Sequence, residues 1–336
     1  MAKFTPFLVA CVLLILGGCG GCENRKTDSG SFRGASSYTP YDAHSMLWTR
    51  EEKGREMVWV SSGGEAGNLL VSDADPGKRP DWILCTQGVV AGLAAKGERV
   101  VVLATVYISE DSIVPVFRKP KRPLDGSQSL YIPRTSIELA FDRLLEREGV
   151  ARDRVRVPNM EKVGFNTIAA LLAKPADDRD ALDFAVLVDP FVTNLIKEHP
   201  GQYEIGRGGL YEIHYSVVAR QDEVKTRRAQ FVELLRQLLA ADDKLASLKD
   251  DDEFYREVWG RKQGDDPDYL PRMLTYRREP ARVQLQLGRL RQHLRSEIEY
   301  LVQKHPEQLK MPEAIDSLVD PSLLEELAPD RVVRQP

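Results

Sequence analysis

The stretch DWILCTQGVVAGLAAKGERVVVLATV, residues 81–106, decides the fold class. It begins with the short apolar run DWILC and continues as a helical pattern. It ends in RVVVLATV, a continuous apolar run typical of a strand that is buried on both faces. Strands that alternate with helices pair in parallel through right-handed crossovers. The stretch therefore predicts an α/β fold.

The same alternation continues on both sides of this stretch. Towards the N-terminus, MVWV (57–60) predicts a strand and SSGGEAGNLL predicts a loop that runs into a helix. Towards the C-terminus, SLYI (129–132), RVRV (154–157) and DFAVLV (183–188) predict the strands of a second α/β unit. Between the first two of these lies a helix with one apolar face, formed by Ile137, Ala140, Phe141, Leu144 and Leu145.

Two extended segments, near 110–124 and near 213–220, join the two units, and a helical tail follows the second. This connectivity indicates that a second lobe is inserted into the first. We therefore predict lobe one over 39–115 and 220–336, and lobe two over 124–215. Each lobe is expected to hold a mostly parallel sheet flanked by helices, with a ligand cleft between the lobes.

The first residues are typical of an export signal. The apolar run from Phe7 to Leu16 is too short for a permanent membrane span, and LGGC (Leu16–Cys19) resembles the lipobox of bacterial lipoproteins. We predict a signal peptide over 1–18, lipidation of Cys19 and a Gly/Ser-rich tether over 19–38. The folded part would then be lipid-anchored at the extracytoplasmic or periplasmic face of a bacterial envelope. The alternative is an ordinary secretory signal.

Composition and motifs exclude several other classes of function. A formal net charge of −4 gives no basic excess for nucleic-acid binding. The five His have no metal-ligand spacing, so we predict no metal and no cofactor. No P-loop, dinucleotide fingerprint or nucleophile elbow occurs, and the glycine-rich GRGGL (206–210) is interpreted as a loop. Cys85 is expected in the core.

A polar seam between a strand and a helix is the first candidate site. Thr135 can cap the helix that follows SLYI, with Glu138 three residues later as in a capping box. Starting the helix could be the whole role of these residues. A helix N-terminus also offers free backbone N–H groups, to which Ser136 adds a hydroxyl and Arg134 a guanidinium. The seam is therefore suited to binding a small anion.

Other polar strand ends share this design. They are Ser61 and Ser62, Thr86 and Gln87, and Asp189, each directly after a predicted strand. Aromatic or imidazole side chains near the expected cleft base or first loop are further candidates, although ordinary packing or a surface position is the favoured interpretation of each: Tyr41, His44, Tyr211 and His214. Asp189 could equally be a turn residue that stops its strand; as a site residue it would pair with an amine or hydroxyl of the ligand.

The order of these segments, from LGGC through DWILC and SLYIPRTSIELAF to the helical tail, resembles the solute-binding lipoproteins of ABC importers. The branch it resembles takes nitrate, alkanesulfonates, taurine and thiamine-pyrimidine precursors. The resemblance spans roughly residues 45–327. It implies a type II periplasmic-binding-protein fold, an anionic or zwitterionic organic ligand and delivery to a membrane permease. It also implies that Arg134–Ser136 and Asp189 occupy ligand-binding loops, with Arg134 in place of a small residue.

Two other functions remain open at this point. A lipoprotein of the same fold could act as a sensor or protein-interaction module through the charged tail RLRQHLRSEIEYLVQKHPEQLK (289–310), which could otherwise be a solvated helix packed on lobe one. An enzyme of the same fold could act on a small heterocycle, and it would need a reactive His44 or His214 in the cleft.

Overall fold

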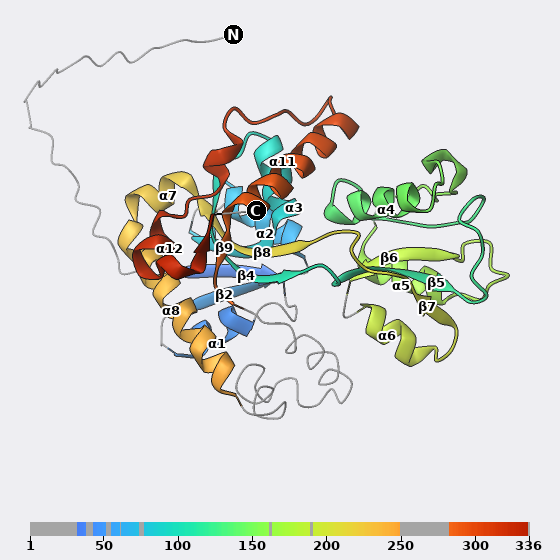
Figure 1. Cartoon of the computed structure of the whole chain (residues 1–336), viewed down its shortest axis with the longest axis horizontal. Coiled ribbons are helices and arrows are strands. Elements are labelled where there is room, and N and C mark those ends of the chain that lie inside the picture. Colours follow the sequence, from blue (N-terminus) through green and yellow to red (C-terminus); the bar gives the residue numbers. More distant parts are fainter. Residues whose placement is uncertain are drawn as a thin grey trace, which may run out of the picture. The chain divides into compact units, whose positions relative to one another are not determined.

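A computed structural model gives the fold of the chain (Figure 1). It describes residues 32–37, 43–51, 55–60, 62–73, 77–160, 163–188, 191–248 and 282–334. Each helix and strand below lies within these ranges. The predicted lipidation site Cys19 lies outside them, as do Tyr41, Ser61 and Asp189.

Lobe one is built on a five-stranded sheet in the order β2-β1-β3-β8-β4. Its strands are β1 (Arg33–Ser37), β2 (Glu56–Val60), β3 (Trp82–Thr86), β4 (Val100–Ser109) and β8 (Ile213–Arg220). β1 pairs in parallel with β2 and β3, whereas β8 is antiparallel to β3 and β4. The two strands of the 81–106 stretch therefore run in the same direction on either side of a strand that returns from lobe two.

β1 was not predicted, and it corrects the tether boundary. Its sequence RGASS has no large apolar residue, yet four of its five residues are buried. Gly34 explains the tight fit, because a Cβ there would lie 2.6 Å from the Trp82 ring. Residues 33–37 are thus sheet residues, and the predicted tether extends too far.

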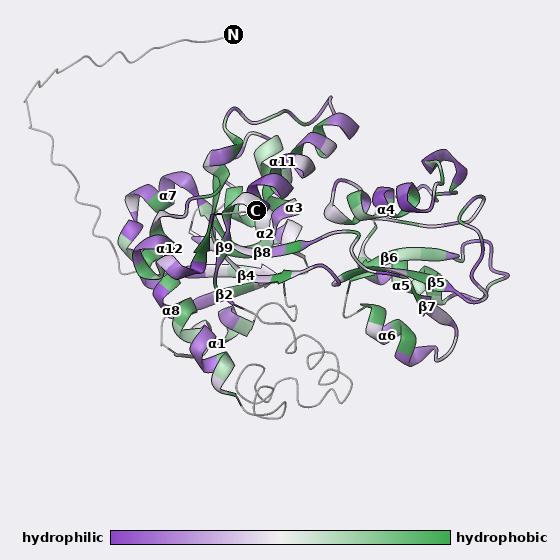
Figure 2. Ribbon diagram, in the orientation of Figure 1, coloured by the Kyte–Doolittle hydropathy of each residue, from purple (hydrophilic) through white to green (hydrophobic). Residues whose placement is uncertain are grey.

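Helices cover both faces of the lobe-one sheet. They are α1 (Ala43–Glu51), α2 (Gly63–Val71), α3 (Gln87–Ala95), α7 (Gln221–Thr226), α8 (Arg228–Ser247), α11 (Leu287–Lys304) and α12 (Ser322–Leu327). The shorter elements are the turns η5 (Ile315–Leu318) and η6 (Pro329–Arg331) and the paired strands β9 (Leu285–Gln286) and β10 (Val332–Val333). Apolar residues line the strands and the inner helix faces (Figure 2). Cys85 is fully buried on β3, as predicted.

Lobe two has a three-stranded sheet in the order β6-β5-β7. It consists of β5 (Ile113–Arg118), β6 (Phe184–Val188) and β7 (Tyr203–Ile205), with helices α4 (Ser136–Arg147), α5 (Phe165–Ala173) and α6 (Phe191–Glu198) and the turn η2 (Arg152–Arg154). Both ladders to the central β5 are antiparallel. The strands expected at SLYI and RVRV are reduced to one parallel bridge between Gln128 and Arg156, so the parallel sheet predicted for this lobe is not found.

The long helix of lobe two matches its pattern. The predicted apolar face of α4 is buried, and Phe141 stacks on Phe184 of β6 with ring centroids 5.9 Å apart. The helix ends before Gly149, whose φ of 65° lies in the left-handed region that glycine tolerates. Packing on the sheet thus fixes the position of α4, and Gly149 marks its end.

Two short connections join the lobes. The chain passes from β4 to β5 through residues 110–112 and returns from β7 to β8 through residues 206–212. Lobe two therefore begins at Ile113 rather than at 124, and β8 is a strand of the lobe-one sheet rather than a crossing segment. GRGGL lies in the return connection, as a loop. A Cβ on Gly206 would lie 2.5 Å from the Phe117 ring, so the return passes very close to β5.

Among the described helices, none is long and apolar enough to cross a membrane.

Candidate functional site

The first turns of α3 and α4, two helices from different lobes, meet around Gly88 and Ser136. From here on, the seam is this meeting place. α3 begins at Gln87 after its N-cap Thr86, and α4 begins at Ser136 after its N-cap Thr135. A Cβ on Gly88 would lie 3.3 Å from Cβ of Ser136, so the two first turns are in close approach. Each N-terminus carries a partial positive charge, although the Ile137, Glu138 and Leu139 N–H groups of α4 already donate to Thr135. Their meeting creates a place that favours a negatively charged or hydrogen-bond-accepting group.

A carboxyl of the chain itself occupies this place. Glu297, on α11, is only 1% exposed. Its Oε2 accepts a hydrogen bond of 2.5 Å from the Tyr211 hydroxyl, and its Oε1 would lie 2.5 Å from a Cβ on Gly88. No described residue offers Oε1 a hydrogen-bond partner. The seam therefore holds a buried carboxyl with one oxygen ready for a donor.

Burial controls the protonation of this pair. It raises the pKa of Glu297 to about 7, against the opposing effects of the Tyr211 hydrogen bond and the positive charge of Arg143. Burial also raises the pKa of Tyr211 well above 10, and the neighbouring Glu297 charge raises it further. At neutral pH, Glu297 can therefore both give and take a proton, while Tyr211 remains a hydrogen-bond donor.

The start of β8 is fixed to α3 by one side chain. The Gln87 Nε2 donates to the Glu212 carbonyl at 2.5 Å, and the His214 backbone N–H donates to Gln87 Oε1 at 2.8 Å. Both ends of the buried Gln87 amide are thus used by the backbone of β8 and of the residue before it. Gln87 positions the neighbouring side chains of Glu212 and His214.

Glu212 lies at the centre of a buried ionic cluster. Its Oε1 bonds to His214 Nε2 and lies 3.5 Å from His293 Nε2, and its Oε2 pairs with Arg289 Nη2 at 2.5 Å. Burial opposes ionisation of Glu212, but the hydrogen bond from His214 and the nearby cationic groups make the net shift of its pKa downward. Burial lowers the pKa of His293. Two imidazoles thus converge on one carboxylate, an arrangement that can hold a cation.

The structure brings together about half of the predicted site residues. Thr86, Gln87, Thr135, Ser136 and His214 lie at or beside the seam, as does Tyr211. Thr135 caps α4 by accepting from the Ile137 N–H at 3.2 Å, while Glu138 accepts from the Arg134 N–H at 2.6 Å. The predicted capping interaction is therefore present in a shifted form. Ligand contact by any of these residues stays a prediction.

Three predicted residues have other partners. Arg134 is exposed with a φ of 59°, and its guanidinium donates to Gln308 Oε1 at 2.6 Å. Ser62 caps α2, accepting from the Glu65 N–H at 3.2 Å. His44 is fully buried and joins α1 to α8 through Asp242 at 2.5 Å. Each of these side chains therefore already has a structural role. A ligand role for them stays a prediction.

Four residues at this place were not predicted from the sequence: Glu212, His293, Arg289 and Glu297. The last three lie in the charged tail at intervals of four residues, which places them on one face of α11. α11 lies beside α3 and reaches α4 (Figure 1), and its buried side holds Leu290, Leu294, Ile298 and Leu301. The tail is thus a packed helix, and its polar stripe faces the seam.

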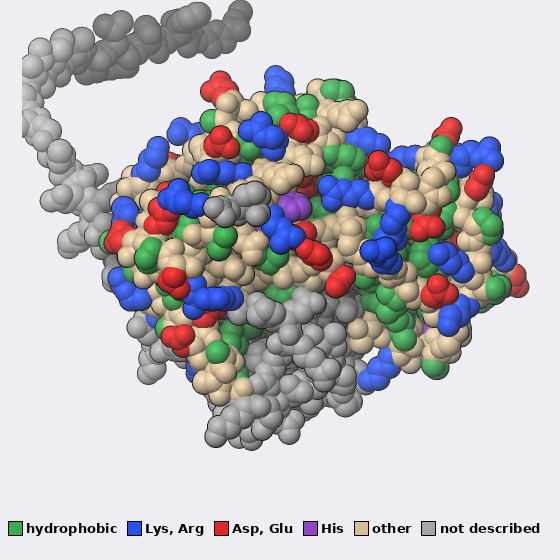
Figure 3. Space-filling view, viewed as in Figure 1, with side chains coloured by type: hydrophobic (Ala, Val, Ile, Leu, Met, Phe, Trp, Pro, Cys, Tyr) green, Lys and Arg blue, Asp and Glu red, His purple; other side chains and the backbone are tan. Residues whose placement is uncertain are grey.

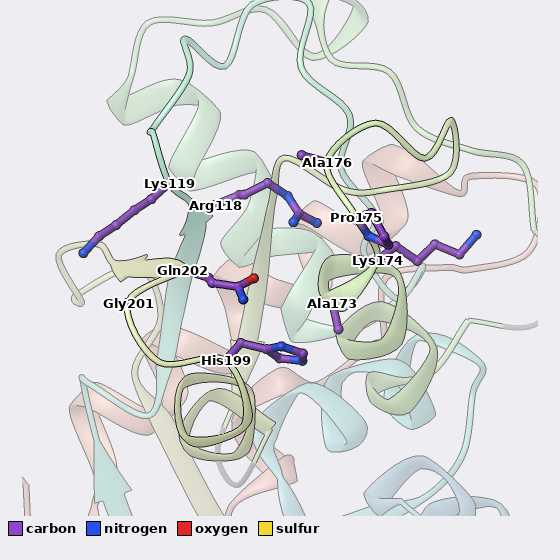
Figure 4. Close-up of a pocket in the computed structure, with 9 residues that line it drawn as sticks. All are labelled: Arg118, Lys119, Ala173, Lys174, Pro175, Ala176, His199, Gly201 and Gln202. Carbon is purple, nitrogen blue, oxygen red and sulfur yellow. The ribbon is translucent and has the colours of Figure 1, made fainter.

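A separate hollow of about 530 Å³ lies at the far end of β5 in lobe two (Figure 4). It is lined by Arg118, Lys119, Ala173, Lys174, Pro175, Ala176, His199, Gly201 and Gln202. Its two central cations already have partners: Arg118 donates to the Leu172 and Leu182 carbonyls, and Lys174 pairs with Asp178 and Asp180. The seam is therefore the stronger candidate site.

Comparison with solved structures agrees with this architecture. The chain is similar to a zinc-bound ligand-binding component of an ABC-type import system from Staphylococcus aureus, with a TM-score of 0.63 and 13% identity over 88% of this chain and 98% of that one. The fold is that of type II periplasmic binding proteins. It is also similar to the periplasmic aliphatic sulphonate-binding protein of Escherichia coli (0.63, 12%, covering 83% and 95%) and to the periplasmic nitrate-binding protein of Synechocystis PCC 6803 (0.64, 10%, covering 90% and 89%).

Sequence comparison alone gives no such connection: no protein-family model matches the chain, and no curated protein matches it significantly. The shared fold is nevertheless that of the solute-binding proteins of ABC importers. On the face shown in Figure 3, acidic and basic side chains are interspersed rather than gathered by sign. This face therefore shows no basic patch of the kind that binds a polyanion.

Proposed function

We propose that the chain is the solute-binding component of an ABC importer, which captures a small polar organic solute at the seam and delivers it to a permease. One observation carries this proposal: the N-termini of α3 and α4, from different lobes, meet at a buried Tyr211–Glu297 pair. Glu297 fills the seam in this structure, so a solute would enter when the lobes part and would then touch both lobes at once. Its binding energy would therefore favour the closed arrangement over an open one, which is the signal that a permease can recognise.

The groups at the seam favour a zwitterion or a weakly basic heterocycle over a simple anion. Glu297 has an oxygen without a partner among the described residues, so it suits an ammonium group or a ring N–H. The partial positive charge of the two helix starts suits an acidic group at the other end of the solute. A plain anion would meet the charge of Glu297 whenever that carboxyl is ionised.

A lipid anchor at Cys19 completes the proposal. It rests on the lipobox-like LGGC and on the polar residues that follow it. Cells that express the full chain should incorporate labelled palmitate into the protein, and Cys19→Ala should abolish the label. Cys22→Ala is the matched control and should keep it. Equal labelling of the Cys19→Ala and wild-type proteins would exclude this anchor.

The protein-interaction alternative is not supported by the position of its main element. The charged tail forms α11, whose buried face packs on α3. The enzyme alternative rests on His44 and His214, and both are fully buried with carboxylate partners.

The proposal is tested by a thermal-shift screen of the mature chain against taurine, alkanesulfonates, nitrate and aminopyrimidines. A true solute at one hundred times its dissociation constant should stabilise the fold by about 2.7 kcal/mol. Ser136→Tyr, which places a ring where α3 and α4 meet, should remove the shift. Ser322→Tyr, at the exposed first turn of α12, should leave it intact. A shift that survives Ser136→Tyr would place the solute elsewhere and overturn the proposal.

A further inference from the structure

We propose that Glu212, His214 and His293 form a binding site for a divalent metal ion of the zinc class. Each offers one ligand atom, and the three atoms lie within 4.8 Å of one another. Two imidazoles and one carboxylate form a donor set that zinc sites use when they keep a coordination position open. The site adjoins the Tyr211–Glu297 pair but uses other residues, and it does not depend on the proposed solute.

Two elements deliver these ligands to one point. Glu212 and His214 are two residues apart at the start of β8, so both side chains lie on the same face of the strand. His293 comes from α11, and its ring centroid is 5.4 Å from that of His214. Both histidines direct Nε2 at the same oxygen, Glu212 Oε1. Three donor atoms therefore converge without any rearrangement of the backbone.

The spacing fits a small ion after a minor side-chain adjustment. Nitrogen and oxygen ligands about 2.0–2.1 Å from a tetrahedral zinc lie about 3.3 Å from each other. The 3.5 Å between His293 Nε2 and Glu212 Oε1 already matches this separation. The His214–Glu212 contact is shorter and would lengthen to admit the ion. His214 Nδ1 has no partner among the described residues, so the imidazole proton can move there and free Nε2.

Surrounding groups hold the ligands in position. Arg289 binds Glu212 Oε2, which leaves Oε1 for the ion. The charge of Arg289 is in turn shared with Glu110 at 2.5 Å. Gln87 fixes the backbone of Glu212 and His214, and so sets the distance between the two strand ligands. Outer partners of this kind orient metal ligands. The cationic Arg289 and Arg143 weaken attraction to a metal ion, so we expect weaker binding than at a four-ligand structural zinc site.

An ion can reach the ligands from solvent. His293 is 24% exposed, which gives an ion a path from solvent to the otherwise buried ligands.

Metal titration of the untagged, metal-free mature chain tests this inference. Calorimetry with ZnCl₂ should show one site per chain, and CoCl₂ should give the visible absorption of tetrahedral cobalt. His293→Gln should weaken zinc binding by at least about 100-fold, because loss of a direct ligand should cost no less than loss of an outer partner. His199→Gln, in the distant hollow of lobe two, should leave it unchanged. The melting temperature of metal-free His293→Gln should stay near that of wild type, which shows that its fold is intact.

Two results would overturn the inference: no zinc binding to wild type, or equal zinc affinity in the His293→Gln and wild-type proteins. Glu212→Gln provides a second measure and should remove the tetrahedral cobalt spectrum. Solute binding is measured on the same metal-free protein. Loss of metal binding with intact solute binding would therefore affect this inference alone and not the proposed function.

Discussion

Glu297 is unusual because its carboxyl is buried. A carboxyl rarely lies fully buried without a cationic partner in contact. Here the first turns of α3 and α4 and the Tyr211 hydroxyl take the place of that partner. Because the pKa of Glu297 rises from 4.5 to about 7, the folded state resists ionisation of this group. Between pH 4.5 and about 7, Glu297 is therefore protonated in the folded protein but ionised in the unfolded chain.

This gives a pH-dependent stability with a definite sign. The contribution of the protonated carboxyl is fully present below pH 4.5 and is lost as the pH rises towards about 7. Glu297→Gln keeps an acceptor for Tyr211 but cannot ionise. Its free energy of unfolding, relative to wild type, should therefore rise between these pH values by about 3 kcal/mol. Urea unfolding at several pH values measures the difference, and a constant difference would show that Glu297 titrates normally.

Gly88 is the second residue with a specific role. A methyl group there would lie 2.5 Å from Glu297 Oε1 and 3.3 Å from Ser136 Cβ, and moving the carboxyl would disturb its bond to Tyr211. We expect Gly88→Ala to lower the free energy of unfolding by about 1–2 kcal/mol. Gly92→Ala is the matched control on the same helix, because nothing lies within 4 Å of its Cβ. That change should stabilise α3 by about 0.5–1 kcal/mol. If both variants are equally stable, α3 and α4 do not meet closely.

At the scale of elements, α11 links the lobes. It belongs to lobe one, yet its Tyr300 hydroxyl donates to Asp142 Oδ2 of α4 at 2.7 Å, and Lys304 lies 2.9 Å from the same oxygen. The carboxylate of Asp142 therefore receives two groups from the other lobe. The contact keeps the starts of α3 and α4 together while Glu297 lies between them.

Tyr300→Phe tests this link. Loss of one partly buried hydrogen bond to a charged acceptor should destabilise the closed arrangement by about 1–2 kcal/mol. Backbone amides at the start of α4 should then exchange hydrogen faster with solvent. Asp125→Ala, which breaks an exposed pair with Arg154 in the same lobe, should leave that exchange unchanged. Unaltered exchange in Tyr300→Phe would show that α11 does not hold α4.

Elements with strong local patterns could be predicted from the sequence, and those defined by context could not. The apolar face of α4 was predictable from its helical periodicity, and β4 from the length of its apolar run. The sequence RGASS of β1 is typical of a linker, because its residues are mostly small and polar. It forms a strand because it is buried between β2 and β3. SLYI has strand-like residues, but the one parallel bridge to RVRV among the described residues is made by the preceding Gln128. The strands of lobe two pair with β5 instead.

At the scale of the whole molecule, the candidate site combines segments that are far apart in the chain. Gly88, Ser136, Tyr211 and Glu297 come from four separate elements or connections. The polar start of α3 was predictable because it directly follows the apolar run of β3, and that of α4 because Thr135 is a typical N-cap residue. Glu297 was not, because its role exists only once α11 packs against both helices. Two lobes joined at residues 110–112 and 206–212 can open and close around such a site.

The most direct test of the account is calorimetric titration of the solute found by screening into three proteins: wild type, Tyr211→Phe and Glu297→Gln. If the solute lies between α3 and α4, both variants should bind at least about tenfold more weakly, because each loses a buried hydrogen-bonding group at the seam. All three proteins should unfold cooperatively at neutral pH, which confirms that the fold is kept. Identical affinities in the three proteins would contradict the account, since the solute would then be held away from the pair on which the site is built.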